Sequence, residues 1–295
     1  MKPRKARCSF VGSPFSIRLP PLLAFTKPDP GPRSGVMTDA PQASKIFRSG
    51  ALEVRVHRLS TAMARAAAQL AGQCLRDCLT RQGRAAVVLA SANSQVEFLE
   101  ALMSEASVDW SRITCFHMDE YLGIAADHPA SFRRFLRERV EQRVRPKAFH
   151  YIAGDCLEPL AECARYAQLL AAQPIDLCCL GIGENGHVAF NDPPVADFAD
   201  PHPIKLVKLD RECRQQQVGE GHYPDLESVP NYAFTLTVPT LCSARRMVCI
   251  VPDQRKAPAV KAALQGTLSP ACPASFLRTQ SHCTLFLDGP SASGL

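Results

Sequence analysis

Residues 180–194 have the sequence LGIGENGHVAFNDPP, and this stretch decides how the rest of the chain is interpreted. The apolar run 175–180 precedes it and lacks hydrophobic/polar alternation, which predicts a buried strand of a parallel sheet. Glycines allow positive φ and close approach of the backbone to a ligand, so a loop after such a strand is a typical site. His187 and Asp192 place a base and a carboxylate beside Gly183 and Gly186.

The glycines at 181, 183 and 186 also match the G-x-G-x-x-G spacing of dinucleotide-binding loops. That fingerprint requires a helix to begin within the glycines, so that its N-terminus can hold a pyrophosphate. Pro193 and Pro194 would stop such a helix after a few residues, which disfavours a nucleotide site. A glycine turn with an incidental histidine stays open until other motifs are considered.

Apolar strands alternate with helical patterns along most of the chain. We expect strands near residues 52–57, 85–90, 113–118, 175–180, 205–209, 233–238, 247–251 and 284–287, and helices near 60–79, 95–105, 131–144, 158–170, 211–217 and from 252. This alternation predicts an α/β fold, an open, mainly parallel, doubly wound (Rossmann-like) sheet with helices on both faces. We expect one domain over residues 46–290.

Residues 1–45 are rich in Pro, Arg, Ser and Gly, which predicts either a disordered extension or an upstream start with Met37 as the working initiator. The net charge of +6 is inflated by the basic residues 1–7, and no long basic run recurs, so we expect no nucleic-acid partner. No apolar run approaches the roughly 20 residues of a transmembrane helix, so we expect no membrane partner.

Thirteen cysteines are scattered through the chain, and none of them forms a C-x-x-C pair. An odd number of cysteines in a core-forming chain favours reduced, buried thiols in the cytoplasm over a disulfide framework. Without paired cysteines we expect no structural zinc, and the site prediction includes no metal.

Two further strand ends carry candidate site residues. The small residues Ser91, Ala92, Asn93 and Ser94 stand between a strand and a helix, where backbone N–H groups and the helix dipole can hold an anion. An ordinary turn capped by Ser94 would explain them without a ligand.

The second strand end carries two adjacent carboxylates, Asp119 and Glu120, at the edge where doubly wound sheets bind ligands. As an alternative, they would simply cap a helix. Arg214 and Lys256 add cations further along the chain. Together these groups favour acid/base chemistry on a phosphorylated small molecule, with a carboxylate moving a carbon-bound proton and the histidine serving oxygen protons.

The segments 116–123 (FHMDEYLG) and 180–193 resemble the two signature motifs of the glucosamine-6-phosphate deaminase (isomerase) family. The resemblance runs from about residue 50 to about residue 288. It implies conversion of glucosamine 6-phosphate and water to fructose 6-phosphate and ammonia, with no cofactor. The implied partner is a small-molecule amino sugar phosphate, and assembly into a homo-oligomer is left open.

The resemblance also implies roles for individual residues. Asp119 corresponds to the base that moves a proton between C2 and C1 of the sugar. His187 corresponds to the residue that opens the pyranose ring, assisted by Asp192. Lys256 and Arg214 would hold the phosphate together with the Ser91–Ser94 loop, although Arg214 could also be a surface cation. The expected substrate contacts include Glu120, Gly183 and Gly186.

Three features depart from the family pattern and indicate a divergent subgroup: two residues of the glycine loop, the loop at 91–94, and residues 195–200, which lack the regulatory phosphosugar residues of allosteric members. Asn185 stands where better-known members have Asp, and Asp192 stands where they have Glu. Because Asn cannot take a proton, ring opening falls more heavily on His187 and Asp192, although Asn185 stays in the predicted catalytic group. The Ser91–Ser94 loop is poorer in glycine than the usual phosphate cradle.

Two other functions stay open at this point. A 6-phosphogluconolactonase-like hydrolase shares the general fold and a glycine-rich loop ending in Gly-His. A non-catalytic sugar-phosphate sensor would keep the pocket without turnover.

Overall fold

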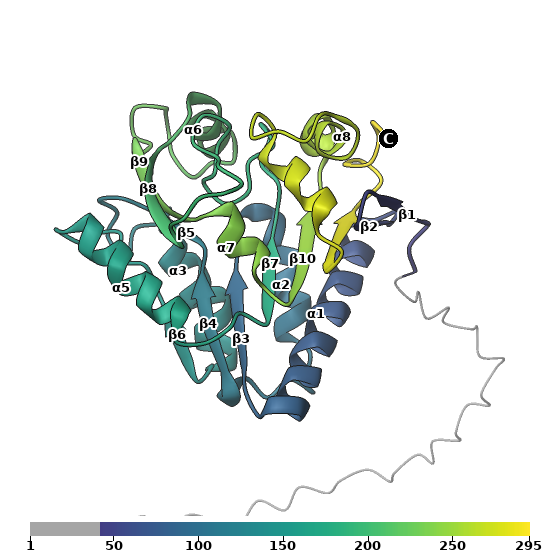
Figure 1. Cartoon of the computed structure of the whole chain (residues 1–295), viewed down its shortest axis with the longest axis horizontal. Coiled ribbons are helices and arrows are strands. Elements are labelled where there is room, and N and C mark those ends of the chain that lie inside the picture. Colours follow the sequence, from purple (N-terminus) through teal and green to yellow (C-terminus); the bar gives the residue numbers. More distant parts are fainter. Residues whose placement is uncertain (1–41) are drawn as a thin grey trace, which may run out of the picture. The chain divides into compact units, whose positions relative to one another are not determined.

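An eight-stranded sheet in the order β1-β2-β11-β10-β7-β3-β4-β6 forms the centre of the structure, a computed structural model that describes residues 42–295 (Figure 1). Every neighbouring pair from β2 to β6 is parallel, and β1 pairs antiparallel with β2. The strands are β1 (Lys45–Ser49), β2 (Leu52–Val56), β3 (Ala85–Leu89), β4 (Ile113–His117), β6 (Ala148–His150), β7 (Leu177–Leu180), β10 (Arg246–Val251) and β11 (Cys283–Leu287).

Helices cover both faces of this sheet. They are α1 (Ser60–Gln82), α2 (Val96–Met103), α3 (Phe132–Leu136), α4 (Gln142–Val144), α5 (Pro159–Ala171), α6 (Arg211–Gly219), α7 (Val238–Cys242) and α8 (Ala257–Gln265). A π turn, Arg137–Glu141, joins α3 to α4, so the helix expected over 131–144 is present with an irregular middle. Gly83 ends α1 by adopting the left-handed conformation (φ 73°), which a residue without Cβ accepts at little cost.

Alternating side chains of the central strands build two separate cores. On one face Val87 of β3 lies in a buried cluster with Leu75 of α1. On the other face Val88 clusters with Tyr166 of α5 and Val260 of α8. Strands buried on both faces carry the continuous apolar runs seen in the sequence. The predicted doubly wound, mainly parallel α/β fold is therefore confirmed.

A second, three-stranded antiparallel sheet lies in the order β5-β9-β8, with β5 (Asp119–Tyr121), β9 (Tyr232–Leu236) and β8 (Ile204–Lys208). The sequence placed Asp119 and Glu120 in a loop, and this was wrong. After β4 ends, the chain continues as an extended segment whose Asp119 pairs with Thr235. Polar side chains at both positions concealed this strand, which has too little apolar character to be recognised.

The ends of the domain also differ from expectation. Folded structure begins with β1 at Lys45, before the strand expected at residue 52, and Ile46 of this edge strand is 62% exposed. After residue 290, Ser291 is buried and exchanges hydrogen bonds with Asp288, so the packed region continues past the predicted boundary. The predictions of a disordered extension and of a start at Met37 concern residues that lie almost wholly outside the described range.

Twelve cysteines within residues 42–295 are free thiols, seven of them buried and five half-buried. Burial raises the pKa of the Cys74 thiol to about 12, and it raises the pKa values of Cys178 and Cys179 well above the ordinary range. In the described part of the chain, no helix combines the length and the apolar character that a bilayer span needs.

Candidate active site

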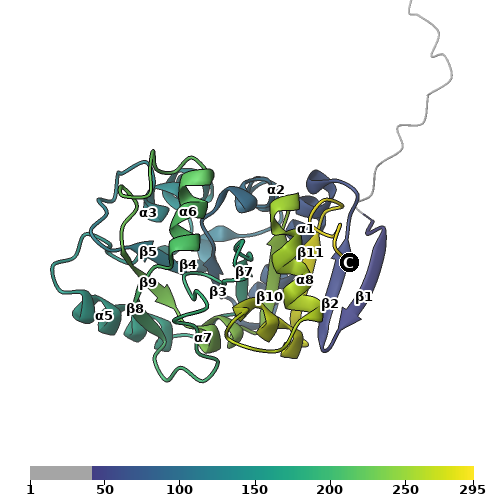
Figure 2. The same ribbon diagram turned by 90° about the horizontal axis from the view of Figure 1, so that it is seen from above.

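The carboxyl ends of several parallel strands open into one pocket. Figure 2 views the molecule from above and shows α6 and α8 on opposite sides of β7. The cavity is lined by Ala90, Ser91, Ala92, Ser94, Gln95, Met118, Asp119, Phe132, Gly181, Ile182, Gly183, His187, Ala189, Phe190, Gln216, Gln217, Glu220, His222 and Lys256. The segments after β3, β4, β7 and β10 therefore meet here, as expected for the carboxyl edge of a doubly wound sheet.

His187 is held by a tight turn of the loop after β7. The Gly183 N–H donates to the carbonyl of His187 at 2.9 Å, and the His187 N–H donates to Oδ1 of Asn185 at 3.0 Å. The imidazole lies against Gly183 so closely that a Cβ there would sit 2.2 Å from the ring. Glycine at 183 is thus required by the position of the ring, and Gly183 also lines the cavity.

The Asp192 carboxylate lies beside Nδ1 of His187. Its Oδ1 lies 3.0 Å from Nδ1 of His187, off the line of an ideal hydrogen bond, and also accepts from Nδ2 of Asn185 at 3.1 Å. Its Oδ2 accepts from the N–H of Asp210 at 3.1 Å. Burial alone would raise the pKa of the Asp192 carboxyl, but His187 and these donors together hold that pKa below its usual value.

Cys213 of α6 lies next to this pair. A nitrogen of His187, an oxygen of Asp192 and the Cys213 sulfur lie within 4.8 Å of one another, and all three residues are buried. The sequence analysis included no metal site, and this set of donors is one that a zinc ion accepts. Burial, followed by the charge of Asp192, raises the pKa of the Cys213 thiol well above its usual value, so the sulfur stays protonated in the metal-free site.

Asp119 and Glu120 have separate tasks. Asp119 lines the cavity, is 6% exposed, and its Oδ1 has no hydrogen-bond partner among the described residues. Burial and the neighbouring Glu120 charge raise the pKa of the Asp119 carboxyl well above its usual value.

Glu120 does not line the cavity, which corrects its assignment as a substrate contact. Its carboxylate accepts from the Ser131 hydroxyl at 2.7 Å and from three backbone N–H groups, those of Tyr121, Phe132 and Arg133, at 3.0–3.2 Å. Glu120 therefore caps α3, and the helix-capping alternative holds for this member of the pair.

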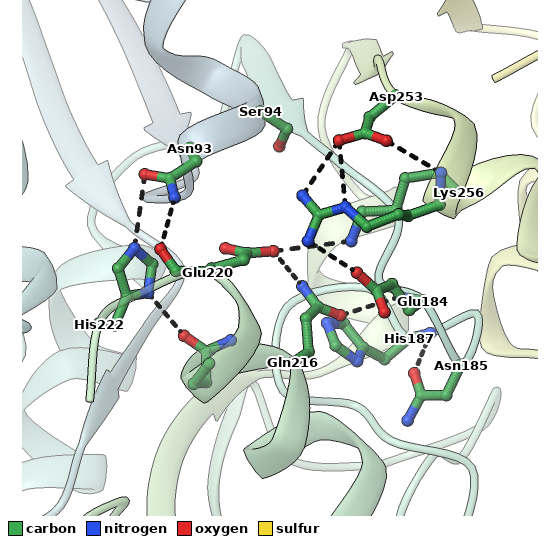
Figure 3. Close-up of polar contacts among 12 residues, drawn as sticks. Asn93, Ser94, Glu184, Asn185, His187, Gln216, Glu220, His222, Asp253 and Lys256 are labelled. Atoms are coloured by element: carbon green, nitrogen blue, oxygen red, sulfur yellow. Dashed lines mark hydrogen bonds and ion pairs between the residues drawn. The ribbon is translucent and has the colours of Figure 1, made fainter. Parts of the chain in front are cut away.

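In the loop after β3, too, some residues line the cavity and one does not. Ser91, Ala92 and Ser94 line the cavity, and the buried Ser91 hydroxyl has no partner within residues 42–295. Asn93 does not line it. Its Nδ2 donates to the backbone carbonyl of Glu220 at 3.2 Å, and its Oδ1 lies 3.4 Å from Nε2 of His222 (Figure 3).

Lys256 brings a cation into the cavity from the turn before α8. Lys256 is 4% exposed, and its Nζ lies 3.8 Å from Oε1 of Glu220. Burial lowers the pKa of the Lys256 ammonium, while the charges of Glu220 and Glu184 act in the opposite direction. Lys256 is thus the predicted phosphate-holding cation that reaches the cavity.

A model of the family described as "Glucosamine-6-phosphate isomerases/6-phosphogluconolactonase" matches residues 58–286 of the chain. This chain belongs to that family. The resemblance inferred from the two sequence motifs is confirmed.

Individual relatives agree with the family assignment. A glucosamine-6-phosphate deaminase from an Exiguobacterium species is 36% identical over 205 residues, 70% of this chain and 78% of that protein. The deaminase of Listeria monocytogenes serotype 4a is 30% identical over 203 residues, 69% of this chain and 85% of that protein.

Solved structures show the same fold. A monomeric glucosamine-6-phosphate deaminase superposes with a TM-score of 0.76 at 27% identity, over 82% of this chain and 99% of that one. A 6-phosphogluconolactonase from Shewanella baltica, at 18% identity, gives a TM-score of 0.66 over 80% of this chain and 97% of that one.

Within this isomerase/lactonase fold, α6 presents a different face from the one the sequence suggested. Arg214 does not line the cavity, because its guanidinium donates to the carbonyls of Leu226 and Val229, the latter at 3.0 Å. This corrects its assignment as a phosphate ligand. Gln216 and Gln217 line the cavity instead.

The sequence analysis missed the polar residues Gln95, Gln216, Gln217, Glu220 and His222, which this family member places around the cavity. Amides do not titrate, so they offered no acid/base signal. The i, i+4 spacing of Gln216 and Glu220 could have indicated a shared helical face. Asn185 and Gly186 lie outside the lining, and Gly186 packs so closely on Cys272 that a Cβ would sit 2.9 Å from its sulfur.

Proposed function

We propose that the protein converts glucosamine 6-phosphate and water to fructose 6-phosphate and ammonia. The observation that supports this proposal most directly is the unpartnered, buried Asp119 oxygen in the same cavity as His187. A base for a carbon-bound proton must reach the substrate with a free lone pair and a pKa high enough to accept that proton. Burial beside Glu120 gives Asp119 a raised pKa.

In the proposed reaction, Asp119 removes the proton from C2 of the open-chain sugar. The electron pair of that C–H bond forms the C1=C2 double bond, and the carbonyl oxygen at C1 takes up a proton. Asp119 then returns its proton to C1, and the nitrogen lone pair moves into the C2–N bond, which leaves a protonated imine at C2. Water adds to this imine, and ammonia leaves as the ketone forms.

Ring opening precedes these steps and moves protons on oxygen. His187 is suited to it because a neutral imidazole both accepts and donates protons near neutral pH. The ionised Asp192 beneath Nδ1 stabilises the imidazolium that forms when Nε2 takes up a proton. Asn185 holds the Asp192 carboxylate and the His187 backbone, so its proposed role is to position that pair.

The phosphate would bind at the Lys256 end of the cavity. Ser91, Ala92 and Ser94 line the same cavity and precede α2, whose N-terminus favours negative charge, and Ser94 also lines an adjoining pocket together with Lys256. The twelve free thiols support a reducing compartment, and we propose the cytoplasm.

Asp119 distinguishes this proposal from lactone hydrolysis. Hydrolysis of a lactone moves protons only between oxygen atoms and needs no base at carbon. The two relatives at 30–36% identity are named glucosamine-6-phosphate deaminases, and the lactonase structure shares the fold at 18% identity.

The test is an assay that measures ammonia and fructose 6-phosphate together over a panel of hexosamine phosphates. We expect equal amounts of both products from glucosamine 6-phosphate, and Asp119→Asn should lose nearly all turnover while still binding substrate. Hydrolysis of 6-phosphogluconolactone without ammonia release from any amino sugar would establish the lactonase instead. Binding without any turnover would establish the sensor.

A further inference from the structure

We propose that Glu220 is a displaceable internal anion. Its carboxylate pairs with Lys256 in the free protein and is displaced from the lysine when a phosphate group binds. The inference rests on the proposed function in taking Lys256 as the phosphate-holding residue. It adds a residue that determines specificity, because an unphosphorylated sugar has no charge with which to displace the Glu220 carboxylate.

The contacts of Glu220 carry the inference. Its Oε1 lies 3.8 Å from Nζ of Lys256, and the two side chains are 6% and 5% exposed. The same oxygen accepts from Nε2 of Gln216 at 2.7 Å. Figure 3 shows the carboxylate directed at the lysine from the end of α6. The cation expected to bind phosphate is therefore already neutralised by this chain's own residue.

Two negative groups cannot share this position without cost. Charges in a nearly buried setting are weakly screened, so a phosphate beside Lys256 would be repelled strongly by a carboxylate left in place. Exchange avoids this repulsion, because the incoming phosphate takes over the lysine. The unpartnered Ser91 hydroxyl lines the same cavity and offers the phosphate a donor that the Glu220 carboxylate does not use.

The structure also provides a destination for the carboxylate. Ser94, Glu220 and Lys256 line a second, adjoining pocket, which Arg255 lines as well. Arg255 is half-exposed and already contacts Asp253 at 3.0 Å and Glu184 at 3.5 Å. The adjoining pocket thus gives a displaced Glu220 side chain room to turn away from Lys256.

The backbone at Glu220 permits such a movement. Gly219 and Gly221 flank it, and a Cβ added to either would meet no atom within 4 Å. Gly221 has a φ of +79°, a conformation that favours glycine. Asn93 ties this segment to the loop after β3 through its hydrogen bond to the Glu220 carbonyl and its contact with His222.

Binding of two small probes, measured by calorimetry at pH 8, tests the proposal without requiring turnover. Methyl phosphate is a dianion at this pH, above its second pKa of about 6, and methyl sulfate is a monoanion of similar shape. If Glu220 is displaced, Glu220→Gln should bind both probes more tightly by the same factor, about tenfold, because the same internal competitor has been removed. Glu220→Ala should do the same.

Glu212→Gln serves as the control, since it removes an equal charge from an exposed position in the first turn of the same helix. A much larger gain for methyl phosphate than for methyl sulfate would show that Glu220 stays beside the ligand, and would overturn the exchange. Weaker binding of both probes would show a structural role and would also overturn it, as would binding of neither probe by any form. If the wild type releases no ammonia, but Glu220→Gln still increases the affinity for both probes equally, the exchange is supported and only the proposed reaction is contradicted.

Discussion

Nδ1 of His187 lies 3.0 Å from Oδ1 of Asp192, and the Asp192 side chain has no exposed surface. Because the pKa of Asp192 is held below its usual value, the carboxylate is charged at neutral pH and favours a proton on Nδ1. Nε2 is then the ring atom left to accept a proton from the substrate. The pair is thus set up for proton transfer between oxygen atoms, and Asp119 is left for the proton on carbon.

This division predicts different losses in two variants. Asp119→Asn should nearly abolish turnover, since the amide keeps the shape and cannot accept a proton. His187→Gln should retain some turnover, because free sugars open slowly in water. With an open-chain analogue that cannot cyclise, exchange of the C2 proton with solvent should persist in the His187 variant and vanish in the Asp119 variant. Equal loss in both would contradict the division of roles.

Lys256→Ala should raise KM for glucosamine 6-phosphate by roughly 10- to 100-fold, since a charge-assisted contact of about 1.5–3 kcal/mol is lost in both ground and transition states. The variant also leaves the Glu220 carboxylate in the cavity without its partner. Lys261→Ala, an exposed lysine on α8, is the matched control for steady-state kinetics. An unchanged KM in the Lys256 variant would remove this residue from the site.

The raised pKa of Asp119 predicts the acid limb of the pH profile. The base form exists above that pKa, so kcat/KM should fall as pH drops through it, at a pH well above the ordinary value of 3.8. Glu120→Gln removes the neighbouring charge and should move this limb to lower pH, provided that the variant folds. A limb that stays in place in the folded variant would rule out the influence of Glu120.

His117 predicts a pH dependence of stability. Burial, followed by the charge of Arg133, lowers the pKa of His117 to about 3, and its Nε2 accepts the N–H of Ile152 at 2.8 Å. The unfolded chain therefore binds a proton below about pH 6.5 that the folded protein excludes, and stability falls as pH falls. From pH 7 to pH 5 this term removes roughly 2 kcal/mol.

Urea unfolding at the two pH values measures this contribution. His117→Gln should show a loss smaller than that of the wild type by the same amount, whereas His128→Gln, at an exposed position, should lose as much as the wild type. Parallel losses in all three proteins would show that His117 does not titrate on unfolding.

Metal removal should leave activity intact. The His187, Asp192 and Cys213 donors lie within 4.8 Å of one another, but none of the proposed steps uses an ion. Dialysis against EDTA should therefore not change kcat. A metal enzyme would be established if activity were lost in EDTA and restored by added zinc, and if Cys213→Ser prevented this restoration.

The sequence predicted the layers of the fold better than it predicted their edges. Residues 85–90 and 177–180 are continuously apolar because β3 and β7 are buried on both faces. β1 was missed because an edge strand with Ile46 largely exposed shows no such pattern. Strands that pair outside the main core, such as β5, are determined by partners distant in the sequence.

The site was predictable to the level of loops and not to the level of side-chain direction. Asp119 and His187, singled out because they follow strands, and Lys256, singled out by the family resemblance, all line the cavity. Nothing local distinguished Asp119 from Glu120, because only the fold decides which carboxylate meets the helix N-terminus. Arg214 was preferred for its charge, although its direction depends on the distant carbonyls that it binds.

Because most of its thiols are buried or half-buried, the reaction of this protein with thiol reagents can report its unfolding. Thiol reagents attack the thiolate, and burial keeps Cys115, Cys178, Cys179 and Cys249 in the protonated form. These four belong to β4, β7 and β10, so their modification requires the central sheet to open. Mass spectrometry of protein exposed to an alkylating reagent would therefore report the fraction of molecules whose central sheet has opened.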